Sequence, residues 1–598
     1  MLRRSIPGAA LLSVLALSVA ACSSSSSSAA PAVSSTTASS ATTSDTSSAS
    51  PSDTASTGGS TSGDPHGGVT LSDPAPLATT QGTQKLVVEN NPHASLQQNF
   101  NQFNGNGFGY QLNMEAFFYE PLLVFNALKA QAAYKWLATD FAWNADGTSI
   151  NFTIRDNVKF SDGTTLTGDD VAYTFQVMKD HIEMNRSGLP IDSATASGNT
   201  VTVKFTKPQF QNLYNIAGQT FIVEKKAYSS QSDPVKFADP TPVGTGPYTL
   251  GSFSPSGIVL KANPNYWGGK PPVPEVDIPA YSTNDVALQQ LAAGKIDYAG
   301  NFISHIDQSF VAKDPAHNKY WFPAINTVNL VYNVSKPGLG DPLVRRAIAA
   351  GINRTSLSQQ AEQGYQAPAS SSSGLLLPNF EANVPAAYKN DIKPTPDQAT
   401  VDTLMKQAGY AKGADGKWAK GGQKVTFKIE DPSAFTDYFD AAKIMAQDLQ
   451  TAGFDASASG VDTAKWFADL AAGNFDTAIH WGTTSPSPYA QYAGWVDSSL
   501  VGSNRTGNYG GFKSPEADQA LADYAKAATN AQAQTAIDAL SKVVSEQAPI
   551  TPLLYAAGWY EYNTKNYSGW VDKDNQYVDP SPNPANCMYL ILHLKPNA

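Results

Sequence analysis

Hydrophobic and polar residues alternate most clearly around residue 150, where the pattern predicts a β-hairpin. Ile150, Phe152 and Ile154 are separated by polar residues, which is the period of a strand with one buried face. Asp146-Gly147 comes shortly before this strand and is typical of a tight turn. The chain is therefore expected to fold back on the apolar segment that precedes the turn.

A helix with one apolar face is predicted next. Asp162-Gly163 marks a second turn, and Thr167 is a good N-cap because its hydroxyl accepts a bond from a free backbone N–H. Val171, Phe175 and Met178 recur at the spacing of one helix face. The stretch thus predicts a hairpin, a turn and a capped helix, and its Asp and Gly residues are interpreted as turn and capping residues.

The rest of the chain after residue 84 mixes the two periods. Strands are predicted at 85–88, 201–205, 324–333, 425–430, 475–481 and 549–555. Helices are predicted after Asp341, after Thr395 with Pro396 at the first helical position, at 437–451, after Ser514 and around 537–544. Because helices and strands alternate through the second half, the fold class is predicted to be α/β.

The first 21 residues have the pattern of an export signal. Arg3 and Arg4 precede an apolar run, Ala9 to Ala21, that is short for a membrane span. The run ends at Cys22 after small residues, which resembles a bacterial lipobox, where the cysteine is acylated. The alternative is a coincidental cysteine beside an ordinary cleavage site.

Residues 22–84 are interpreted as a disordered tether. They are almost wholly Ser, Thr, Ala, Pro, Gly and Asp, a composition with too little apolar surface to offset chain entropy. About 515 residues follow, which is more than one hydrophobic core usually serves, so two or more lobes are expected. Cys587 is the one other cysteine, so no internal disulfide is expected once Cys22 carries lipid.

The charge of the chain argues against two classes of partner. The formal net charge is -11 at pH 7 and no basic run follows Arg4. Binding to nucleic acid or to an anionic membrane surface is therefore not expected.

Several motifs together resemble one family of bacterial receptors. They are Val158-Lys159-Phe160, Asp162-Gly163, Thr167 with Asp170-Val171, PTPVGTGPY at 240–248, Asn265-Tyr266-Trp267-Gly268, Gly294 to Asp297, and DPLVRRAIAAGINR at 341–354. This set is similar to the family 5 extracellular solute-binding proteins, the dipeptide- and oligopeptide-binding components of ABC importers. The resemblance covers nearly everything from Lys85 to Ala598.

The resemblance implies a two-lobed periplasmic-binding-protein (Venus flytrap) fold with an extra subdomain in the first lobe. The expected order is signal peptide 1–21, tether 22–84, lobe I 85–126, lobe I subdomain 127–240, lobe I 241–327, lobe II 328–563 and a return to lobe I at 564–598. Two crossings between the lobes, expected near 324–333 and 555–564, would form a hinge.

The resemblance also implies a function. The protein is expected to capture a short oligopeptide in the interlobe cleft and to deliver it to an ABC permease that a separate ATPase drives. It is expected to act as a monomer on the outer face of the cell membrane, held there by the lipid on Cys22, without a cofactor and without enzymatic activity.

Two segments supply candidate ligand-binding residues. Phe100, Asn101, Phe103 and Tyr110 combine rings that stack on planar faces with an amide that fixes hydrogen bonds; the alternative is a packed Asn-rich loop. The second segment contributes Trp481, Thr483, Thr484, Ser485, Tyr489 and Trp495.

The second segment also bears on the class of ligand. In peptide-binding relatives an aspartate shortly after the corresponding tryptophan pairs with the α-ammonium of the peptide, whereas here hydroxyl side chains occupy that place and no carboxylate occurs before Asp497. The expected ligand is therefore an oligosaccharide, or a peptide whose binding does not change on N-acetylation; the family as a whole favours peptides.

The sequence contains no convincing catalytic or metal-binding motif. The seven histidines are scattered without zinc-ligand spacing, and Asp572, Asp574 and Asp579 lack the glycine and glutamate of a calcium loop. The two catalytic carboxylates of a glycosidase can lie far apart in the sequence and then form no recognisable motif, so a surface hydrolase is the alternative from another functional class.

Overall fold

The computed structural model describes residues 66–597, except 78, 79, 91–94, 105, 106, 108–111, 283, 378, 434, 503, 504, 506 and 583. The predictions of a signal peptide, of an acylated Cys22 and of most of the tether lie outside the described residues. The described residues belong to one unit, Thr61–Ala598.

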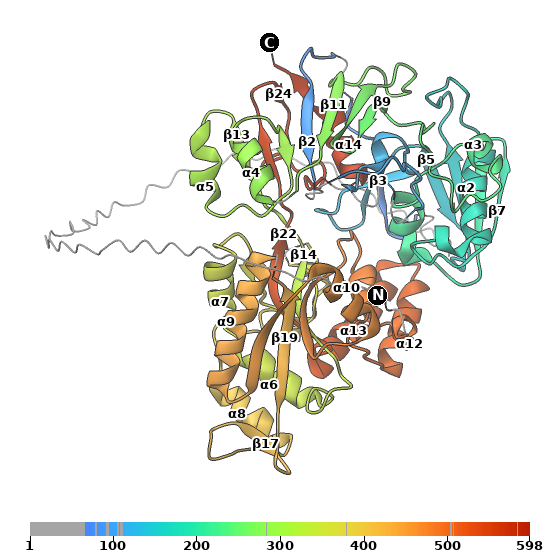
Figure 1. Ribbon diagram of the computed structural model, residues 1–598. Coiled ribbons are helices and arrows are strands. Elements are labelled where there is room, and N and C mark those ends of the chain that lie inside the picture. The colour runs from blue at the N-terminus through green and yellow to red at the C-terminus, as the bar shows by residue number, and fades with distance from the viewer. Residues whose placement is uncertain are drawn as a thin grey trace, which may run out of the picture. The chain divides into compact units, whose positions relative to one another are not determined.

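Lobe I is organised around a seven-stranded sheet that joins the two ends of the folded chain (Figure 1). The strand order is β13 (Asn318–Tyr320), β23 (Glu561–Asn563), β12 (Tyr298–Ala299), β2 (Leu86–Glu89), β11 (Glu275–Pro279), β10 (Gly257–Ala262) and β9 (Tyr248–Ser254). The helices of this lobe include α4 (Asn284–Ala292), α5 (Ile306–Ser309) and α14 (Pro584–His593). The apolar residues of β2 and α14 belong to the same core although nearly 500 residues separate them.

Lobe II has a six-stranded sheet. The order is β15 (Ala367–Pro368), β22 (Ile550–Ala557), β14 (Ala324–Tyr332), β21 (Thr477–Trp481), β19 (Thr426–Pro432) and β20 (Asp455–Val461). Its helices are α6 (Pro342–Gly351), α7 (Arg354–Ser356), α8 (Gln398–Gln407), α9 (Thr436–Ala452), α10 (Thr463–Ala472), α11 (Pro488–Val496), α12 (Pro515–Ala525) and α13 (Asn530–Gln547). The predicted alternation of helices and strands in this half is confirmed.

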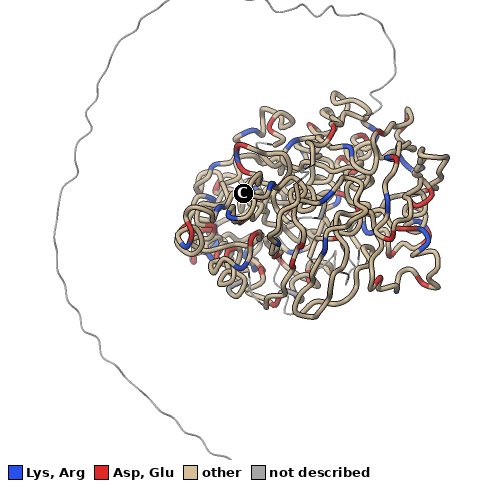
Figure 2. Tube along the Cα trace, turned by 90° about the horizontal axis from the view of Figure 1, so that it is seen from above, with Lys and Arg blue, Asp and Glu red and all other residues tan. Residues whose placement is uncertain are grey.

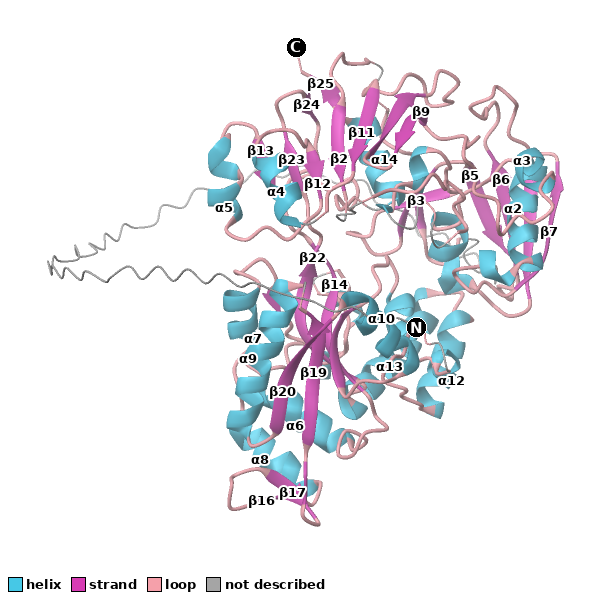
Figure 3. Ribbon diagram, in the orientation of Figure 1, coloured by secondary structure: helices cyan, strands magenta, loops and turns pink. Residues whose placement is uncertain are grey.

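The chain passes between the two sheets twice. It leaves β13 for β14 through residues 321–323 and returns from β22 to β23 through residues 558–560. Strand β14 enters lobe II from lobe I and is antiparallel to β21, while β19 is parallel to β21. The carboxyl ends of β19 and β21 therefore lie at the edge of lobe II that faces lobe I (Figure 3).

The four-stranded sheet β5 (Ala138–Trp143), β6 (Ser149–Ile154), β8 (Thr200–Phe205) and β7 (Ile191–Ser197) forms a subdomain of lobe I with α2 (Gly168–Asp180). The hairpin predicted around Asp146-Gly147 is confirmed, because β5 and β6 are antiparallel neighbours. The helix cap is confirmed as well: the backbone N–H of Thr167 donates to the Asp170 carboxylate at 2.9 Å, completing a capping box.

Short elements complete the described chain. They are β1 (Thr70–Ser72), η1 (Glu115–Phe117), β3 (Leu123–Phe125), β4 (Ala132–Lys135), η2 (Ile182–Met184), η3 (Phe210–Asn212), η4 (Tyr214–Gly218), α3 (Lys225–Ser229), η5 (Val311–Lys313), η6 (Leu357–Ala361), η7 (Glu381–Asn383), η8 (Ala386–Tyr388), β16 (Ala411–Lys412), β17 (Trp418–Lys420), β18 (Gln423–Lys424), η9 (Ser498–Leu500), β24 (Tyr567–Ser568) and β25 (Lys595–Pro596).

Segments that lie far apart in the sequence meet around the buried carboxylate of Glu120. This carboxylate accepts hydrogen bonds from the indole of Trp136 at 2.7 Å, from the hydroxyl of Tyr266 at 3.0 Å and from the indole of Trp267 at 2.9 Å. The Arg155 guanidinium lies 4.4 Å from the centre of the Trp267 ring. Arg155 and the Tyr266-Trp267 turn of the sequence motif are therefore parts of one network around Glu120.

The two glycines of the Gly-Thr-Gly-Pro-Tyr motif permit a close approach of two backbone segments. A Cβ on Gly244 would lie 1.9 Å from the carbonyl oxygen of Phe118, and one on Gly246 would lie 2.4 Å from that of Phe117. A side chain does not fit at either position, so these glycines have a packing role.

One predicted helix start is wrong. Thr395 and Pro396 were expected to begin a helix, but α8 begins at Gln398, and Asp397 is its N-cap. The Asp397 carboxylate accepts from the backbone N–H of Thr400 at 3.2 Å and from the Thr400 hydroxyl at 2.7 Å. An aspartate caps a helix at least as well as a threonine, and Asp397 takes this role here.

Charged residues of both signs are interspersed along the fold (Figure 2). Among the residues that the structure describes, no helix combines the length and apolar character needed to cross a bilayer.

Candidate ligand-binding site

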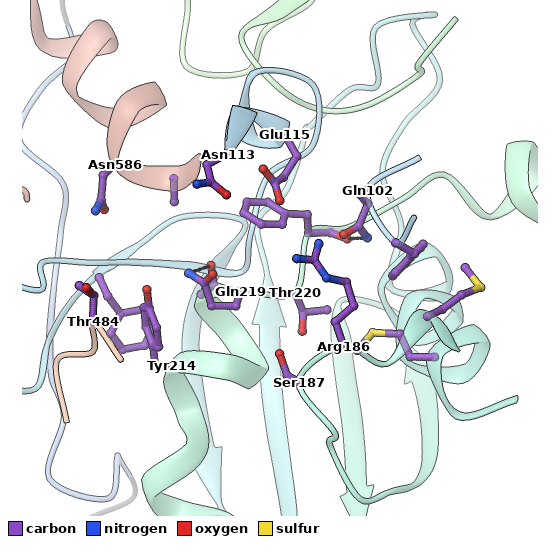
Figure 4. A pocket seen from close by; sticks show the side chains of 17 residues that line it. Gln102, Asn113, Glu115, Arg186, Ser187, Tyr214, Gln219, Thr220, Thr484 and Asn586 are labelled. Atoms are coloured by element: carbon purple, nitrogen blue, oxygen red, sulfur yellow. Dashed lines mark hydrogen bonds between the residues drawn. The ribbon is translucent and has the colours of Figure 1, made fainter. Parts of the chain in front are cut away.

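A cavity of about 380 Å³ lies in lobe I beside the segment that follows β21 of lobe II (Figure 4). Its walls come from η1, η4, the turn before β7 and the start of α14, and lobe II contributes Thr484. The polar side chains that line it are Gln102, Asn113, Glu115, Arg186, Ser187, Tyr214, Gln219, Thr220, Thr484 and Asn586. The volume is within the range of roughly 300–1,000 Å³ that is typical of small-molecule sites.

Glu115 supplies the carboxylate of the cavity. It is the first residue of η1, and its side chain is buried with one carboxylate oxygen, Oε2, without a hydrogen-bond partner among the described residues. Burial raises the pKa of Glu115 to about 7, although Arg186 acts in the opposite direction. This side chain can therefore accept hydrogen bonds as a carboxylate, or donate one when it is protonated, near neutral pH.

Arg186 and Ser187 reach the cavity from an exposed turn that Asn185 shapes. The Asn185 amide donates to the carbonyl of Leu189 at 2.7 Å and accepts from the backbone N–H of the same residue at 2.9 Å. These two bonds fix the turn between η2 and β7. Figure 4 shows the Arg186 guanidinium and the Glu115 carboxylate directed toward the same part of the cavity.

The π-helix η4 forms another wall. Tyr214 begins it, and burial raises the pKa of the Tyr214 hydroxyl, so this group stays a neutral donor and acceptor. The Thr220 hydroxyl donates to the carbonyl of Asn215 at 3.0 Å, which holds the end of η4 in place. Short π-helical segments occur frequently at functional sites.

Thr484 brings lobe II to the cavity. Its hydroxyl accepts a hydrogen bond from the amide of Asn326, on β14, at 3.1 Å. Because β14 follows the first crossing between the lobes, a change in the angle between the lobes would move Thr484 relative to the remaining walls of the cavity.

Direct hydrogen bonds join the lobes beside the cavity. The backbone N–H of Gln131 donates to the carbonyl of Pro486 at 3.0 Å, and the Gln211 amide donates to the carbonyl of Ala527 at 3.1 Å. The Asn379 amide donates to the carbonyl of Ala127 at 3.1 Å. The structure therefore represents a state in which the subdomain of lobe I contacts lobe II.

A smaller cavity of about 130 Å³ lies in lobe II and is lined in part by Trp481, Thr483 and Trp495. His480 is buried between aromatic rings, with the ring of Trp481 4.6 Å away and that of Trp466 5.4 Å away. Burial lowers the pKa of His480 to about 4, so the ring is neutral at physiological pH.

The structure separates the predicted ligand residues of the first segment. Phe103 lines the large cavity. Phe100 is buried against Phe118, with ring centres 5.3 Å apart. The Asn101 amide donates to the backbone carbonyls of Pro234 and Phe237 at 3.0 and 2.8 Å. Contact of Phe100 and Asn101 with a ligand stays a prediction, and Tyr110, with the neighbouring Phe108, lies outside the described residues.

The second segment is divided between the two cavities. Thr484 lines the larger one, and Trp481, Thr483 and Trp495 line the smaller one. Ser485 is buried, and its hydroxyl accepts from the backbone N–H of Ser487 at 3.2 Å. The ring of Tyr489 packs edge-on against Tyr524 at 5.4 Å. Binding of a ligand by these side chains stays a prediction.

Sequence reasoning missed most of the cavity. Glu115, Arg186, Gln219 and Asn586 belong to segments in which no motif was recognised. Two of them carried a weak signal: Glu115 precedes an aromatic run, and Asn586 is in the first turn of the otherwise apolar helix α14, so each is a polar residue where apolar ones are expected.

The fold and the cavity define a class of protein, the two-lobed α/β receptors that hold a solute between their lobes. The family described as "Bacterial extracellular solute-binding proteins, family 5 Middle" matches residues 132–503, more than half of the chain. The chain belongs to this family, which confirms the resemblance of its sequence motifs.

Two of the proteins to which the chain is similar are named for different solutes. The chain is 29% identical to Protein XP55 of Streptomyces lividans over 327 residues, which are 53% of this chain and 57% of that relative. It is 27% identical to the nickel-binding periplasmic protein of Escherichia coli over 69% of this chain and 77% of the relative. It is 25% identical to the peptide transport periplasmic protein SapA of Salmonella typhimurium over 71% of this chain and 78% of that relative.

Solved structures confirm the predicted fold class. A periplasmic oligopeptide-binding protein of Thermotoga maritima, solved with bound mannohexaose, has a TM-score of 0.73 and 22% identity, and the match covers 87% of this chain and 100% of that one. The oligopeptide-binding protein AppA of Bacillus subtilis, solved with a nonapeptide, has a TM-score of 0.69 and 20% identity, and the match covers 87% of this chain and 100% of that one.

Proposed function

We propose that this protein is the solute-binding component of an ABC importer and that it captures a short oligopeptide in the cavity beside Thr484. The observation that supports this most directly is that one cavity takes its lining from both lobes, Thr484 from lobe II and the remainder from lobe I. A ligand that contacts both lobes favours the closed state by the difference between its affinities for the closed and open forms. A permease would recognise that closure.

The polar lining suits a peptide backbone. A peptide presents alternating N–H donors and carbonyl acceptors, and the amides of Asn113, Gln219 and Asn586 offer both kinds of group. Glu115 and Arg186 supply charges of opposite sign at one end of the cavity, where they would pair with charged groups of a ligand.

An oligosaccharide is the second candidate ligand, and a specific observation favours it. The cavity carries the hydroxyls of Ser187, Thr220 and Thr484 together with the aromatic rings of Phe103 and Tyr214. Hydroxyls and ring faces are what a neutral sugar chain requires. The structural neighbour from Thermotoga maritima is described with mannohexaose.

A surface hydrolase, the candidate from another class, finds little support in the cavity. Glycoside hydrolysis usually needs two carboxylates that flank the scissile bond. Of the residues that line the cavity, Glu115 is the one that carries a carboxylate. The family is one of solute receptors.

The anchor and the surroundings of the protein are part of the proposal. We infer that Cys22 is acylated after the export signal is removed, and that residues 22–84 hold a monomeric receptor away from the outer face of the membrane. The lipobox pattern before Cys22 supports this inference. The domain boundaries given above remain part of the same proposal.

Calorimetry with purified protein tests the proposed ligand. Tri-alanine, tetra-alanine and mannohexaose would be titrated into the wild type and into Thr484→Ala and Glu115→Gln. We expect a peptide to bind, and each substitution to weaken binding roughly 2- to 20-fold through the loss of a hydrogen bond. Thr535→Ala, on the exposed face of α13, and the exposed Glu183→Gln are matched controls. Binding of mannohexaose but not of the peptides would transfer the proposal to a sugar.

A further inference from the structure

Three acidic side chains of lobe II lie together at the end of the sheet that faces lobe I. Asp431 is close to the carboxyl end of β19, and Asp437 is in the first turn of α9, which packs against this strand. Glu362 follows η6, which also packs against α9. Asp431 is on the same strand face as Phe427 and Ile429, so it continues the buried layer between the sheet and α9.

Most acceptor oxygens of this cluster have no hydrogen-bond partner among the described residues. Asp431 is 1% exposed, and neither of its carboxylate oxygens has a hydrogen-bond partner among the described residues. The buried amide of Gln366 donates to Glu362 Oε2 at 2.7 Å, whereas Gln366 Oε1 and Glu362 Oε1 are unpartnered within the described part of the chain. Four buried acceptor oxygens of these side chains therefore have no hydrogen-bond partner among the described residues.

Such an arrangement is costly for the protein alone. Buried polar groups are nearly always hydrogen-bonded, and a buried carboxylate without a partner is among the most unfavourable exceptions. The charged groups that act on Asp431 and Glu362 are other acids of the same cluster, and burial, followed by repulsion from Asp437, raises the pKa of Asp431 to about 9. The missing element is a group with several N–H donors and a positive charge.

We propose that the cluster of Asp431, Glu362 and Gln366 binds a positively charged nitrogen group of the transported solute, an ammonium or a guanidinium. An ammonium offers three N–H donors and a guanidinium five, and neither accepts a hydrogen bond, which matches the four free acceptors. The cation takes the place of the proton that Asp431 otherwise holds, and that proton passes to solvent. A metal ion fits less well, since no group of His, Cys, Asp and Glu side chains in the described residues has the geometry of a metal site.

Aromatic side chains extend from the cluster to the segment that carries Thr484. The ring of Tyr438, which follows Asp437, stacks on the ring of Trp481 with centres 6.5 Å apart. Trp481 precedes Thr484 by three residues in the sequence, and Thr484 lines the cavity of about 380 Å³. The faces of these rings attract a cation. The inference rests on the proposed receptor function. If the bound cation is the α-ammonium of a peptide, N-acetylation weakens binding, and if it is a side chain, the expectation that N-acetylation has no effect stands.

Calorimetry with three synthetic peptides tests the subsite: tri-alanine, N-acetyl-tri-alanine and N-acetyl-Ala-Lys-Ala, each with the wild type, Asp431→Asn and Glu362→Gln. We expect the wild type to bind its preferred cationic peptide roughly 10- to 100-fold more tightly than the peptide without a cation. Each variant should bind that cationic peptide more weakly than the wild type by the same factor. For N-acetyl-tri-alanine, the peptide without a cation, the affinity of each variant should equal that of the wild type. Asp440→Asn on the exposed side of α9 is the matched control. Circular dichroism of each variant verifies the fold, and Glu362→Gln decides the matter if Asp431→Asn does not fold.

The peptides also distinguish the source of the cation. Preference for tri-alanine identifies the α-ammonium, and preference for N-acetyl-Ala-Lys-Ala identifies a side chain. If the folded variants bind every peptide as the wild type does, the cation subsite is overturned while the receptor function stands. If the wild type binds no peptide, the peptide proposal fails, and 1,4-diaminobutane is then used to test the subsite. This diamine should raise the melting temperature of the wild type more than that of Asp431→Asn. Equal shifts of the two melting temperatures would overturn the cation subsite.

Discussion

The hydrogen bond between Gln211 and Ala527 provides a test of whether closure of the lobes controls ligand binding. Gln211, in η3 of the lobe I subdomain, is 9% exposed, and its amide donates to the Ala527 carbonyl, just after α12 of lobe II, at 3.1 Å. If the lobes separate when no ligand is bound, this bond exists in the closed state alone. Gln211→Ala should then destabilise the closed state selectively.

The size of the effect follows from the bond. A neutral hydrogen bond of this kind contributes about 0.5–1.5 kcal/mol, so its loss should lower the closed-to-open ratio roughly 2- to 13-fold. Because the ligand binds the closed state, its apparent affinity should fall by up to the same factor, with the full factor observed if the open state predominates without ligand. The substitution removes no residue from the wall of the cavity.

Two measurements check this expectation. Small-angle scattering gives the radius of gyration with and without ligand: we expect the wild type to compact on binding, and Gln211→Ala to be at least as open without ligand and to compact only at higher ligand concentration. Calorimetry gives the change in affinity. Gln176→Ala, which removes an amide that bonds Asp180 within α2, is the control. Wild-type affinity in a folded Gln211→Ala protein would refute the reasoning, as would the absence of compaction in a wild type that starts open.

Further substitutions test other parts of the structure. Cys22→Ala should move the protein from the membrane fraction into the medium, because the polar tether cannot replace the affinity of the lipid; unchanged retention would refute acylation. Trp481→Ala should weaken ligand binding by about 1–3 kcal/mol in calorimetry through lost burial and stacking. Glu120→Gln should lower the free energy of urea unfolding by about 1–3 kcal/mol, because the amide nitrogen cannot accept from the donors that surround the carboxylate. Burial raises the pKa of Glu89 to about 7 and that of Asp431 to about 9, above their unfolded values near 4, so the folded state keeps protons that the unfolded state loses. Their contribution to stability is complete below about pH 4 and is lost as pH rises through 7 for Glu89 and through 9 for Asp431, at no more than roughly 1.4 kcal/mol per pH unit for each group. Urea unfolding at a series of pH values should show that the unfolding free energy declines less steeply with pH in Asp431→Asn than in the wild type. Equal slopes would contradict this.

Most of the elements could be predicted because local signals suffice for them. The alternation of Ile150, Phe152 and Ile154 corresponds to a strand with those three residues buried. Gly453 ends α9 in a left-handed conformation, as a glycine after an apolar helix predicts. The helix start at Thr395 was predicted wrongly because Asp397, two residues later, is also a residue type that caps helices, and it is the one that accepts from Thr400.

The candidate site could be predicted only in part because it forms from segments that are distant in sequence. Thr484 and Phe103 were selected by residue type, and both line the large cavity. Glu115 and Arg186 lie more than 70 positions apart, and nothing local shows that a turn places them at one cavity. Asp431 ends a strand in the sequence, where an acid is ordinarily solvated, and only the packing of α9 over it reveals its burial.

Glu120 and Asp431 show why hydrogen-bond partners are the better guide to function in this fold. Both carboxylates are almost fully buried, and burial raises the pKa of each, to about 7 for Glu120 and to about 9 for Asp431, so burial alone does not separate them. Glu120 accepts from two indoles and a tyrosine hydroxyl, so the protein itself satisfies it. Asp431 has no donor among the described residues. Because a buried acceptor without a donor weakens the fold, its presence at the edge of lobe II that faces lobe I is best explained by a donor that arrives with the solute.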